Sequence, residues 1–549
     1  MLTSSGPASS PPKALLPGHV RVPPDFANRY RTAGWWEGRS LGDVFMEAFA
    51  THGDREALVG GTERVTYRQL ADRSRNVAAG LQRLGLRPLD RVVVHLPNSL
   101  EFVYAYFGLQ LIGAIPVMAL PAHRRSEIEH FVDLGGARAY LHAGRLGDLD
   151  TGALAADLQR AHASLEVVVT QAAVSTLAAR EAAVGRPSID PADPAVFLLS
   201  GGTTGLPKLI PRTHEDYLHN SRCAGAVNDI GRDDALLVVL PLGHNFPLAC
   251  PGLQAFLLAG ARVVIGEGSG AAANLALVAR ERVTHLELVP AVLIRWLEDP
   301  ALAEHDLQSI RIVNTGGQRL QPEVKRRTLD LLPGARVQEV FGMAEGLLCF
   351  NRLDDPPQVM VETTGRPVSP GDEIRIVDED GSEVAPGVTG ELLCRGPYTI
   401  RGYFQAPAHN AKAFTPDGFY RSGDLVRMHS SGNLVVQGRS KDLINRGGEK
   451  ISAEEIEDLA LGHPAILNIA CVPMPDRVLG ERICAFAVLR PSASLTLEEL
   501  SAYLLGRGIA KFKLPERLEL LAELPMTRIG KVSKRNLVEM VGNSGRDTG

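Results

Sequence analysis

A glycine-rich segment in the first half of the chain has the residue types of a phosphate-binding loop. Ser200–Lys208 reads SGGTTGLPK and follows the apolar run Ala195–Leu199, which predicts a strand. Glycine N–H groups can close around an anion, threonine hydroxyls add donors, and Lys208 supplies a positive charge. The segment is not a Walker loop, because that motif has glycine directly before lysine and Pro207 intervenes here. Standing alone, it would be explained equally well by an ordinary Gly/Thr turn.

Four more motifs follow the loop in order. They are FGMAE at Phe341–Glu345, YRSGD at Tyr420–Asp424, GRSKD at Gly438–Asp442 and the pair Gly530-Lys531. As an ordered set, these motifs resemble the core motifs of the adenylate-forming superfamily, which includes acyl-CoA synthetases, luciferases and peptide-synthetase adenylation domains. The resemblance runs from about Trp35 to Leu537. It implies an enzyme that uses ATP and Mg²⁺ to join a carboxylate to AMP, with no tightly bound organic cofactor.

Composition agrees with this resemblance and excludes other classes. The 549 residues predict several structural units, and 45% hydrophobic with 22% charged residues is typical of a soluble globular protein. A net charge of −5 argues against a nucleic-acid partner. The six cysteines form no CxxC pair, which favours free thiols in a reducing cytoplasm. Phe102–Pro121 is the one candidate membrane span; because it contains Gln110 and Pro116, it is interpreted as a buried helix that runs into a core strand.

Alternating strand and helix patterns predict an α/β fold. Strands over Arg91–His95, Ala261–Ile265 and Ile310–Asn314 alternate with helices over Tyr67–Leu84 and Ala271–Arg282, which indicates a mostly parallel sheet covered by helices. With the resemblance, the expected fold is a large N-terminal domain of two helix-covered, mostly parallel sheets plus a small β-barrel subdomain. The barrel is expected from about Gly365, where short strands such as Glu373–Val377 and Gly390–Cys394 begin. A small, mobile α+β C-terminal domain follows, and it opens with a helix over Ala453–Leu461.

The expected domain boundaries follow from these motifs and from composition. They are a flexible leader at 1–30, an AMP-binding and aryl-acid-binding domain at 31–438, a hinge at 439–441, a mobile C-terminal domain at 442–541 and a tail at 542–549.

Adenylation joins two anions, so the site needs cations and N–H dipoles where charge develops. The resemblance implies that the loop binds the β- and γ-phosphates, that Glu345 and Thr204 bind Mg²⁺, and that Asp424 accepts from the ribose hydroxyls with help from Arg439. As an alternative, Glu345 could cap a helix. The expected ATP- and AMP-binding residues are Ser200, Gly201, Gly202, Thr203, Thr204, Gly205, Lys208, Gly317, Gln318, Glu339, Val340, Phe341, Gly342, Met343, Ala344, Glu345, Asp424 and Arg439.

Three lysines are the expected catalytic residues. Lys531 resembles the C-terminal lysine of the superfamily, which bridges the substrate carboxylate and the α-phosphate, although an isolated surface lysine is usually only a solvated charge. Lys441 matches the hinge position. Lys450 ends a loop, Gly447–Lys450, that resembles the segment entering the site after the small domain rotates. Two faces of one small domain would then serve two half-reactions.

The segment Leu242–Gly252, with Gly34–Gly38, resembles stand-alone aryl-acid adenylating enzymes of siderophore pathways, which load salicylate or 2,3-dihydroxybenzoate onto an aryl carrier protein. Asn245 stands where enzymes for α-amino acids carry Asp, and a neutral amide does not balance a buried ammonium. Cys250 and Leu348 stand where dihydroxybenzoate enzymes carry Ser and Val, which favours salicylate, although Cys250 could simply pack. The expected aryl-acid-binding residues are His244, Asn245, Phe246, Cys250, Gly316, Gly317 and Leu348.

The expected function is therefore adenylation of a 2-hydroxyaryl acid, most favourably salicylate, followed by transfer to the phosphopantetheine thiol of an aryl carrier protein. The alternatives are a 2,3-dihydroxybenzoate- or 3-hydroxypicolinate-AMP ligase and an aryl-CoA ligase that uses free coenzyme A. A non-catalytic adenylate sensor is a further alternative, and the joint presence of Lys531, Asp424, Arg439 and Glu345 argues against it. We expect neither a nucleic-acid partner nor a membrane.

Overall fold

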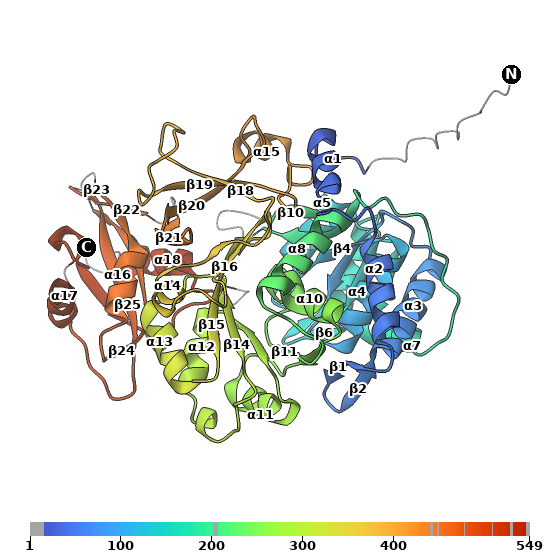
Figure 1. The fold of residues 1–549 in the computed structure, drawn as a ribbon, viewed down its shortest axis with the longest axis horizontal. Helices are drawn as coiled ribbons and strands as arrows, with labels where there is room; N and C mark the ends of the chain where they lie inside the picture. The colour runs from blue at the N-terminus through green and yellow to red at the C-terminus, as the bar shows by residue number, and fades with distance from the viewer. Residues whose placement is uncertain are drawn as a thin grey trace.

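Two large helix-covered sheets form the body of the protein in the computed structural model (Figure 1), which describes residues 16–200, 207–439, 443–446, 449–476, 478–507, 509–527 and 531–544. Within these residues the first sheet has nine strands. They are, across the sheet, β17 (Arg366–Pro367), β16 (Gly346–Phe350), β15 (Arg336–Met343), β14 (Ile312–Gly316), β13 (His285–Leu288), β11 (Ala235–Val238), β12 (Arg262–Ile265), β1 (Glu56–Gly60) and β2 (Glu63–Thr66). The strands from β15 to β1 are parallel, and antiparallel strands extend both edges.

The second sheet has six strands in the described part of the chain. They are β10 (Leu209–Thr213), β9 (Pro194–Leu199), β4 (Ile115–Met118), β3 (Arg91–His95), β5 (Ala139–His142) and β8 (Val167–Thr170). All neighbours are parallel except β9 and β10, which form a hairpin. The expectation of two mostly parallel sheets is confirmed.

Helices cover these sheets and fill the space between them. The helices of the large domain are α1 (Pro24–Thr32), α2 (Leu41–His52), α3 (Tyr67–Arg83), α4 (Leu100–Ile112), α5 (Arg125–Gly135), α6 (Thr151–Ala161), α7 (Gln171–Ala178), α8 (His214–Val227), α9 (Asn245–Ala249), α10 (Gly252–Ala259), α11 (Ala271–Glu281), α12 (Pro290–Glu298), α13 (Pro322–Leu331), α14 (Pro357–Glu362) and α15 (Pro407–Ala413). The helices predicted over Tyr67–Leu84 and Ala271–Arg282 are α3 and α11. The strand predicted over Ile310–Asn314 begins two residues later, because Ile310 N–H turns back to the Leu307 carbonyl.

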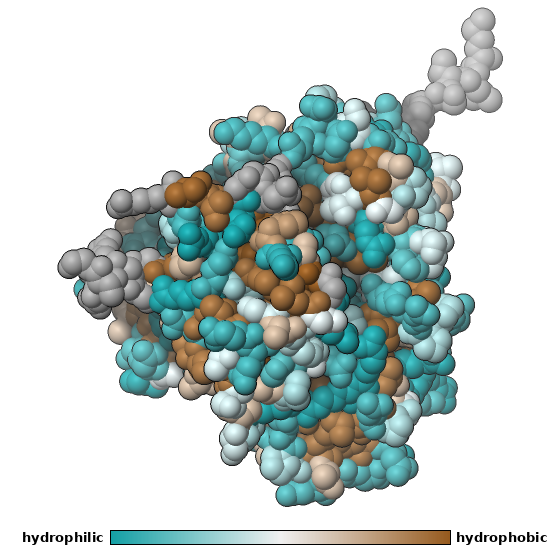
Figure 2. Space-filling model, turned by 90° about the vertical axis from the view of Figure 1, so that its left-hand side faces the viewer, coloured by the Kyte–Doolittle hydropathy of each residue, from teal (hydrophilic) through white to brown (hydrophobic). Residues whose placement is uncertain are grey.

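Helix α4 explains the apolar run that could have been mistaken for a membrane span. It is buried on every side from Phe102 to Ile112, and β4 follows it, as the sequence predicted. Gln110 is buried within it and donates its side-chain amide to the Ala195 carbonyl of β9 over 2.9 Å. In the described residues, no helix combines the length and apolar character needed to cross a bilayer. Hydrophobic side chains on the face in Figure 2 form separate patches among hydrophilic ones.

After residue 365 the chain forms smaller sheets. The expected barrel-like subdomain is a four-stranded antiparallel sheet, β18 (Glu373–Val377), β19 (Gly390–Arg395), β20 (Tyr420–Met428) and β21 (Leu434–Arg439). The small C-terminal domain contains β22 (Leu443–Arg446), β23 (Glu449–Ser452), β24 (Ile466–Asp476), β25 (Gly480–Leu489) and β26 (Arg517–Leu520), with α16 (Ala453–Ala460), α17 (Leu497–Gly506) and α18 (Lys534–Ser544). Its core, which includes Ile456 and Leu500, is its own. Figure 1 shows this domain at the end of the molecule opposite α2 and α3.

Helix α1 (Pro24–Thr32) lies mostly within the segment 1–30 that the sequence predicted to be a leader. Helix α1 packs against the large domain through Tyr30, which is fully buried beside Trp36. Trp36 in turn donates its indole N–H to the Pro397 carbonyl over 2.8 Å. Proline and serine dominate the preceding sequence, and only Ala27 and Tyr30 of this helix are buried, so no clear pattern indicated it.

Candidate active site

Ser200 and Lys208 close the two ends of the glycine-rich loop. Ser200 N–H donates to the Lys208 carbonyl over 3.0 Å, and Lys208 N–H donates to Ser200 Oγ over 2.9 Å. The loop is therefore the connection of the β9–β10 hairpin and starts at the carboxyl end of a core strand, as predicted. The predicted phosphate ligands inside the loop lie outside the described residues; these are Gly201, Gly202, Thr203, Thr204 and Gly205.

Tyr403 contacts both Lys208 and Glu345, the predicted metal ligand. The Lys208 ammonium lies 5.8 Å from the centre of the Tyr403 ring, and the Tyr403 hydroxyl donates to Glu345 Oε1 over 2.7 Å. A second hydroxyl, that of Tyr420, lies 3.0 Å from the first. Burial and the neighbouring carboxylate raise the pKa of Tyr403 far above its usual range, so it stays a donor to Glu345. The structure thus brings the predicted phosphate-binding cation and the predicted metal ligand together.

Glu345 occupies the turn between β15 and β16, which excludes the alternative that it caps a helix. β15 carries the predicted residues Glu339 to Met343 up to this turn. The Glu345 carboxylate is 8% exposed, and one of its oxygens is fixed by Tyr403. A single oriented carboxylate suits Mg²⁺, which keeps several waters and takes its other ligands from phosphate. The donor present therefore fits the expected ion, with Thr204 outside the described residues.

Asp424 and Arg439 are direct neighbours across β20 and β21. Asp424 is 4% exposed, and its backbone N–H donates to Ser422 Oγ over 3.0 Å. The Ser422 hydroxyl in turn donates to the Leu392 carbonyl over 2.8 Å. The register places the two predicted ribose-binding residues side by side, although the structure describes only the backbone of Arg439.

Lys531 reaches from the small domain into the large domain at the end of β14. A Cβ atom added at Gly317 would lie 2.8 Å from Lys531 Cε and 3.6 Å from its Nζ. Gly317 has a φ of 89°, a conformation that glycine adopts without strain. Next to it, Val532 N–H donates to Gln318 Oε1 over 3.3 Å. These contacts place the Lys531 ammonium beside Gly317 and Gln318, two of the predicted nucleotide-binding residues.

The structure describes the other two predicted catalytic lysines less fully, and the roles of all three stay predictions. Lys441, the expected hinge residue, lies outside the described residues. Lys450 belongs to β23, and the structure describes its backbone but not its side chain.

Tyr217 orients Asn245 at the predicted aryl-acid site. Its hydroxyl donates to Asn245 Oδ1 over 2.8 Å, so the amide nitrogen is the end that can donate to a ligand. His244 precedes Asn245 and accepts from Phe246 N–H through Nδ1 over 3.3 Å. Burial, with a smaller contribution from the positive charge of Lys531, lowers the pKa of His244 to about 3, so it is neutral. The aryl-acid residues and Lys531 therefore belong to one site.

Cys250 and Leu348, two of the predicted aryl-acid residues, are buried side chains on different elements. Both are 2% exposed. Cys250 follows α9, and burial raises the pKa of its thiol to about 12, so it remains a neutral thiol and a poor hydrogen-bonding group. Leu348 lies on β16, where its N–H donates to the Tyr398 hydroxyl over 3.1 Å. A Cβ atom at Gly316 would lie 3.6 Å from the Phe246 ring, which places Phe246 against the end of β14.

Arg212 is a functional residue that the motifs did not single out. It is fully buried, and its guanidinium donates to Asp216 Oδ1 over 2.8 Å and to the Ala344 carbonyl over 3.1 Å. It also lies 4.8 Å from the centre of the Tyr217 ring. Arg212 therefore supports the turn that carries Glu345 and the tyrosine that orients Asn245. A charged residue within the apolar strand β10 was the signal available in the sequence.

Glu339, a predicted nucleotide-binding residue, is held by partners within the protein. Its carboxylate pairs with Lys325 over 2.5 Å, both groups are almost completely buried, and it also accepts Leu320 N–H over 3.0 Å. Lys325 donates further to three carbonyls of the segment 360–363. This side chain therefore fixes the segment after Gln318, while a direct contact with nucleotide remains a prediction.

The contact between the two domains is strongly charged. Asp458 of α16 pairs with Arg319 of the large domain, and beside it, within the small domain, Glu457 pairs with Lys534 of α18 over 2.7 Å. A cavity of about 50 Å³ lies between these groups. Glu454 Oε2 is buried and has no hydrogen-bond partner among the described residues. Burial raises the pKa of Glu454 to about 7 and that of Asp458 to about 6, although Arg319 acts against the shift of Asp458.

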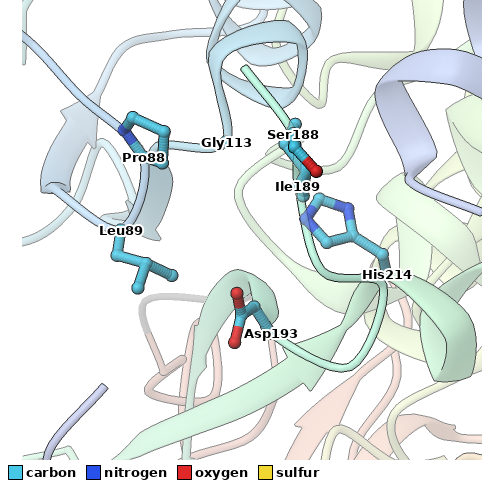
Figure 3. A pocket seen from close by; sticks show the side chains of 7 residues that line it. All are labelled: Pro88, Leu89, Gly113, Ser188, Ile189, Asp193 and His214. Carbon is cyan, nitrogen blue, oxygen red and sulfur yellow. The ribbon is translucent and has the colours of Figure 1, made fainter. Parts of the chain in front are cut away.

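A second cavity, of about 140 Å³ (Figure 3), lies at the end of the six-stranded sheet opposite the glycine-rich loop. Asp193, which lines it, directly precedes β9 and Leu89 lies two residues before β3, whereas Ser200 follows β9. His214 points toward it and accepts Leu41 N–H through Nδ1 over 3.2 Å. None of the predicted site residues is among its lining residues.

Comparison with known proteins gives two family matches. Residues 45–404 match the AMP-binding enzyme family, and residues 455–531 match the C-terminal domain of AMP-binding enzymes.

Relatives match over nearly the whole chain. A protein named salicylyl-CoA synthase / salicylate adenylyltransferase, from a Streptomyces species, is 47% identical over 95% of this chain and 98% of its own length. A salicyl-AMP ligase / salicyl-S-ArCP synthetase from Mycobacterium tuberculosis is 44% identical over 97% and 96%. The solved apo structure of Mycobacterium smegmatis MbtA has a TM-score of 0.73 and 43% identity, covering 95% of this chain and 98% of that one.

Proposed function

Because this chain belongs to the AMP-binding enzyme family, we propose that it activates a 2-hydroxyaryl acid, salicylate above others, as an aryl-AMP. ATP supplies the AMP, pyrophosphate leaves, and the aryl group then passes to the phosphopantetheine thiol of an aryl carrier protein. The relatives' names agree with aryl-acid adenylation. The observation that carries the proposal is the position of Lys531 at Gly317, in one site with the aryl-acid residues.

The residues of the site divide the adenylation step between them. Lys531 offsets the repulsion between the substrate carboxylate and the α-phosphate, two anions that must approach within bonding distance. Lys208 and the loop that it ends hold the β- and γ-phosphates until pyrophosphate leaves. Asp424 accepts from the ribose hydroxyls. Mg²⁺, when bound, neutralises phosphate charge, and Glu345 would hold it with the hydroxyl of Thr204.

Asn245 selects the aryl acid through its ortho-hydroxyl. Tyr217 holds the amide with its nitrogen available, and a neutral amide pairs with a hydroxyl but does not balance an ammonium ion. Benzoate lacks the hydroxyl and leaves the buried amide unpaired, which costs about 1–3 kcal/mol. An α-amino acid would bury its ammonium without a counter-charge. Salicylate and closely related 2-hydroxyaryl acids satisfy the site.

The wild-type enzyme should prefer salicylate to 2,3-dihydroxybenzoate by about tenfold to a hundredfold in kcat/KM. A second ring hydroxyl would face the Cys250 thiol and the Leu348 side chain, and poor pairing costs about 1–3 kcal/mol, at 1.4 kcal/mol per decade. The double variant Cys250→Ser with Leu348→Val restores a donor and some volume, so it should narrow or invert the ratio. Competing-substrate kinetics give the ratio directly.

The matched control is Cys223→Ser. This residue lies against His219, with its Sγ 3.4 Å from Nε2, and does not belong to the aryl-acid set. The same thiol-to-hydroxyl change there should leave the ratio unaltered. If kcat/KM of the wild-type enzyme is higher for 2,3-dihydroxybenzoate than for salicylate, Cys250 and Leu348 do not have the proposed role in specificity. The proposed adenylation chemistry would be unaffected by that result.

Pyrophosphate exchange across a panel of aryl acids tests the proposed function. Salicylate should support the fastest exchange, benzoate and anthranilate should be poor, and amino acids should be inactive. Transfer to a phosphopantetheinylated aryl carrier protein should then exceed transfer to free coenzyme A at equal concentrations. Faster transfer to coenzyme A would make the protein an aryl-CoA ligase, and no exchange with any aryl acid would refute the proposal.

A further inference from the structure

Three polar side chains form a buried row on one face of the nine-stranded sheet. Glu287 on β13 is directly opposite Asn314 on β14, and Asn314 is directly opposite Gln338 on β15. Residues in register on parallel strands point to the same face, with strands about 4.8 Å apart. All three side chains are at most 1% exposed. We call Glu287, Asn314 and Gln338 the polar row.

Helices α8 and α10 cover this face. Gly252 N–H, at the start of α10, donates to Glu287 Oε1 over 2.8 Å. Phe256, one helical turn later, lies edge-on over His285, which precedes Glu287 on the same face. At the other end of the row, Gln338 donates to the carbonyls of Val227 and Asn351. Each member of the row thus uses one polar atom to hold a neighbouring element.

The remaining polar atom of each side chain is an oxygen, and this oxygen lacks a hydrogen-bond partner among the described residues. These atoms are Glu287 Oε2, Asn314 Oδ1 and Gln338 Oε1. Asn314 already uses its nitrogen to donate to Asn228 over 2.8 Å. Glu287 and Asn314 therefore present two acceptors from adjacent, in-register positions with no donor between them. Buried acceptors left in this way are costly, and one proton on Glu287 satisfies both.

In the part of the chain that the structure describes, the groups packed around Glu287 supply no unpaired positive charge to its carboxylate. Cys250, on the turn before Gly252, is a neutral thiol because burial raises its pKa to about 12. Burial lowers the pKa of His285 to about 4, so it too is neutral near pH 7. Arg212 is bound to Asp216. An unpaired carboxylate in this place would cost far more than its protonated form.

We propose that Glu287 is a neutral carboxylic acid that donates its proton to Asn314 Oδ1 and, through Gly252, holds the turn that carries Cys250. Glu287 is then a positioning residue for aryl-acid recognition. This last step rests on the function proposed above, whereas the protonated state does not.

The protonated state predicts a distinct dependence of stability on pH. Burial raises the pKa of Glu287 from 4.5 to about 8, against a smaller opposing effect of the Gly252 N–H. Between these two pH values the native protein keeps a proton that the unfolded chain releases, so its contribution makes stability fall as pH rises, and the fall ends above pH 8. Glu287→Gln keeps the acceptor for Gly252 and supplies a permanent N–H for Asn314. It should equal wild type at acidic pH and exceed it increasingly up to about pH 8 in denaturant midpoint.

Infrared spectroscopy gives a second, independent readout. At neutral pH the difference spectrum of wild type minus Glu287→Gln should contain the carbonyl band of a protonated carboxyl group, because other buried carboxyl groups such as Glu454 contribute equally to both spectra. Equal pH dependence of the two denaturant midpoints, or no difference in this band, would overturn the protonated state. Both measurements need no substrate, so they hold even if the proposed function fails.

The positioning role is tested by a matched pair of variants. Glu287→Leu leaves Gly252 N–H unpartnered beside Cys250, whereas Gln338→Leu makes an equally buried polar-to-apolar change at the far end of the row. Both should lower stability. Only Glu287→Leu should raise KM for salicylate, by about tenfold, with KM for ATP unchanged.

The wild-type enzyme should also bind salicylate more weakly above about pH 8, where Glu287 ionises, while Glu287→Gln should keep a constant KM. Equal effects of Glu287→Leu and Gln338→Leu on the salicylate KM would show that Glu287 is only structural. If wild type adenylates no aryl acid, the proposed function is wrong and the positioning role falls with it, while the protonated state is still judged by the two substrate-free measurements.

Discussion

Lys531→Ala should lower the rate of aryl-AMP formation by about a hundredfold to a thousandfold, the usual effect of removing one charge-stabilising donor from an active site. The Lys531 side chain lies against Gly317, within reach of both the aryl-acid residues and the nucleotide segment. In the proposed function, its ammonium is the cation that the small domain brings to the two reacting anions. Pyrophosphate exchange measures this half-reaction.

The second half-reaction separates catalysis from folding. Transfer from pre-formed aryl-AMP to the carrier protein should be nearly unchanged in Lys531→Ala, because no new anion–anion contact forms in that step. Lys511→Ala, which removes an exposed lysine of the same domain, should affect neither half-reaction. An equal loss of both half-reactions in Lys531→Ala would count against the assigned role.

Arg212→Met should destabilise the protein by about 3–5 kcal/mol, the usual cost of removing one partner of a buried ion pair. The change leaves Asp216 buried without its cation and the Ala344 carbonyl without its donor. It also removes the cation beside Tyr217, which orients Asn245. Denaturant unfolding measures the free energy, and KM for salicylate should rise in the fraction that folds.

A second substitution identifies the cause of this loss. Adding Asp216→Leu to Arg212→Met removes the stranded carboxylate and should recover much of the stability, because a buried pair replaced by apolar residues often costs little. Arg68→Met breaks an exposed pair with Asp54 and should change the unfolding free energy hardly at all. A double variant no more stable than Arg212→Met would show that the hydrogen bond to Ala344 dominates.

The fold followed from local patterns because each pattern had a single structural solution. Apolar runs such as Arg91–His95 became central strands, and the amphipathic segment that became α3 starts at Thr66 with a capping box. Helix α1 was missed because its burial depends on Tyr30 and on Trp36, which contacts Pro397, a partner far away in sequence. Such long-range contacts leave no periodic signal in a short segment.

The same distinction between local motifs and long-range contacts applies to the residues of the candidate site. Ser200, Glu345, Asp424 and Lys531 could be predicted because each belongs to a motif whose spacing is tied to its chemistry. The residues that orient them, Arg212, Tyr217 and Tyr403, could not be found in this way. A tyrosine that donates to Glu345 from 58 positions away has no spacing to recognise. The partner of Glu339 was missed for the same reason: Lys325 lies on a helix whose position only the packed structure reveals.

The charged contact between the domains has a consequence for how the small domain can leave the site. When two surfaces held together by apolar packing separate, their hydrophobic side chains become exposed to water, which is unfavourable. Carboxylates and an arginine are instead well hydrated once they are separated. Arg319, Asp458 and Glu454 therefore form a junction that water can replace. Because burial raises the pKa of Glu454 and Asp458 only while they are enclosed, any orientation that frees α16 also releases protons as it hydrates these groups. Departure of Lys531 from Gly317 would then be coupled to proton release. Mildly alkaline pH and added salt should both shift this equilibrium toward the separated domains.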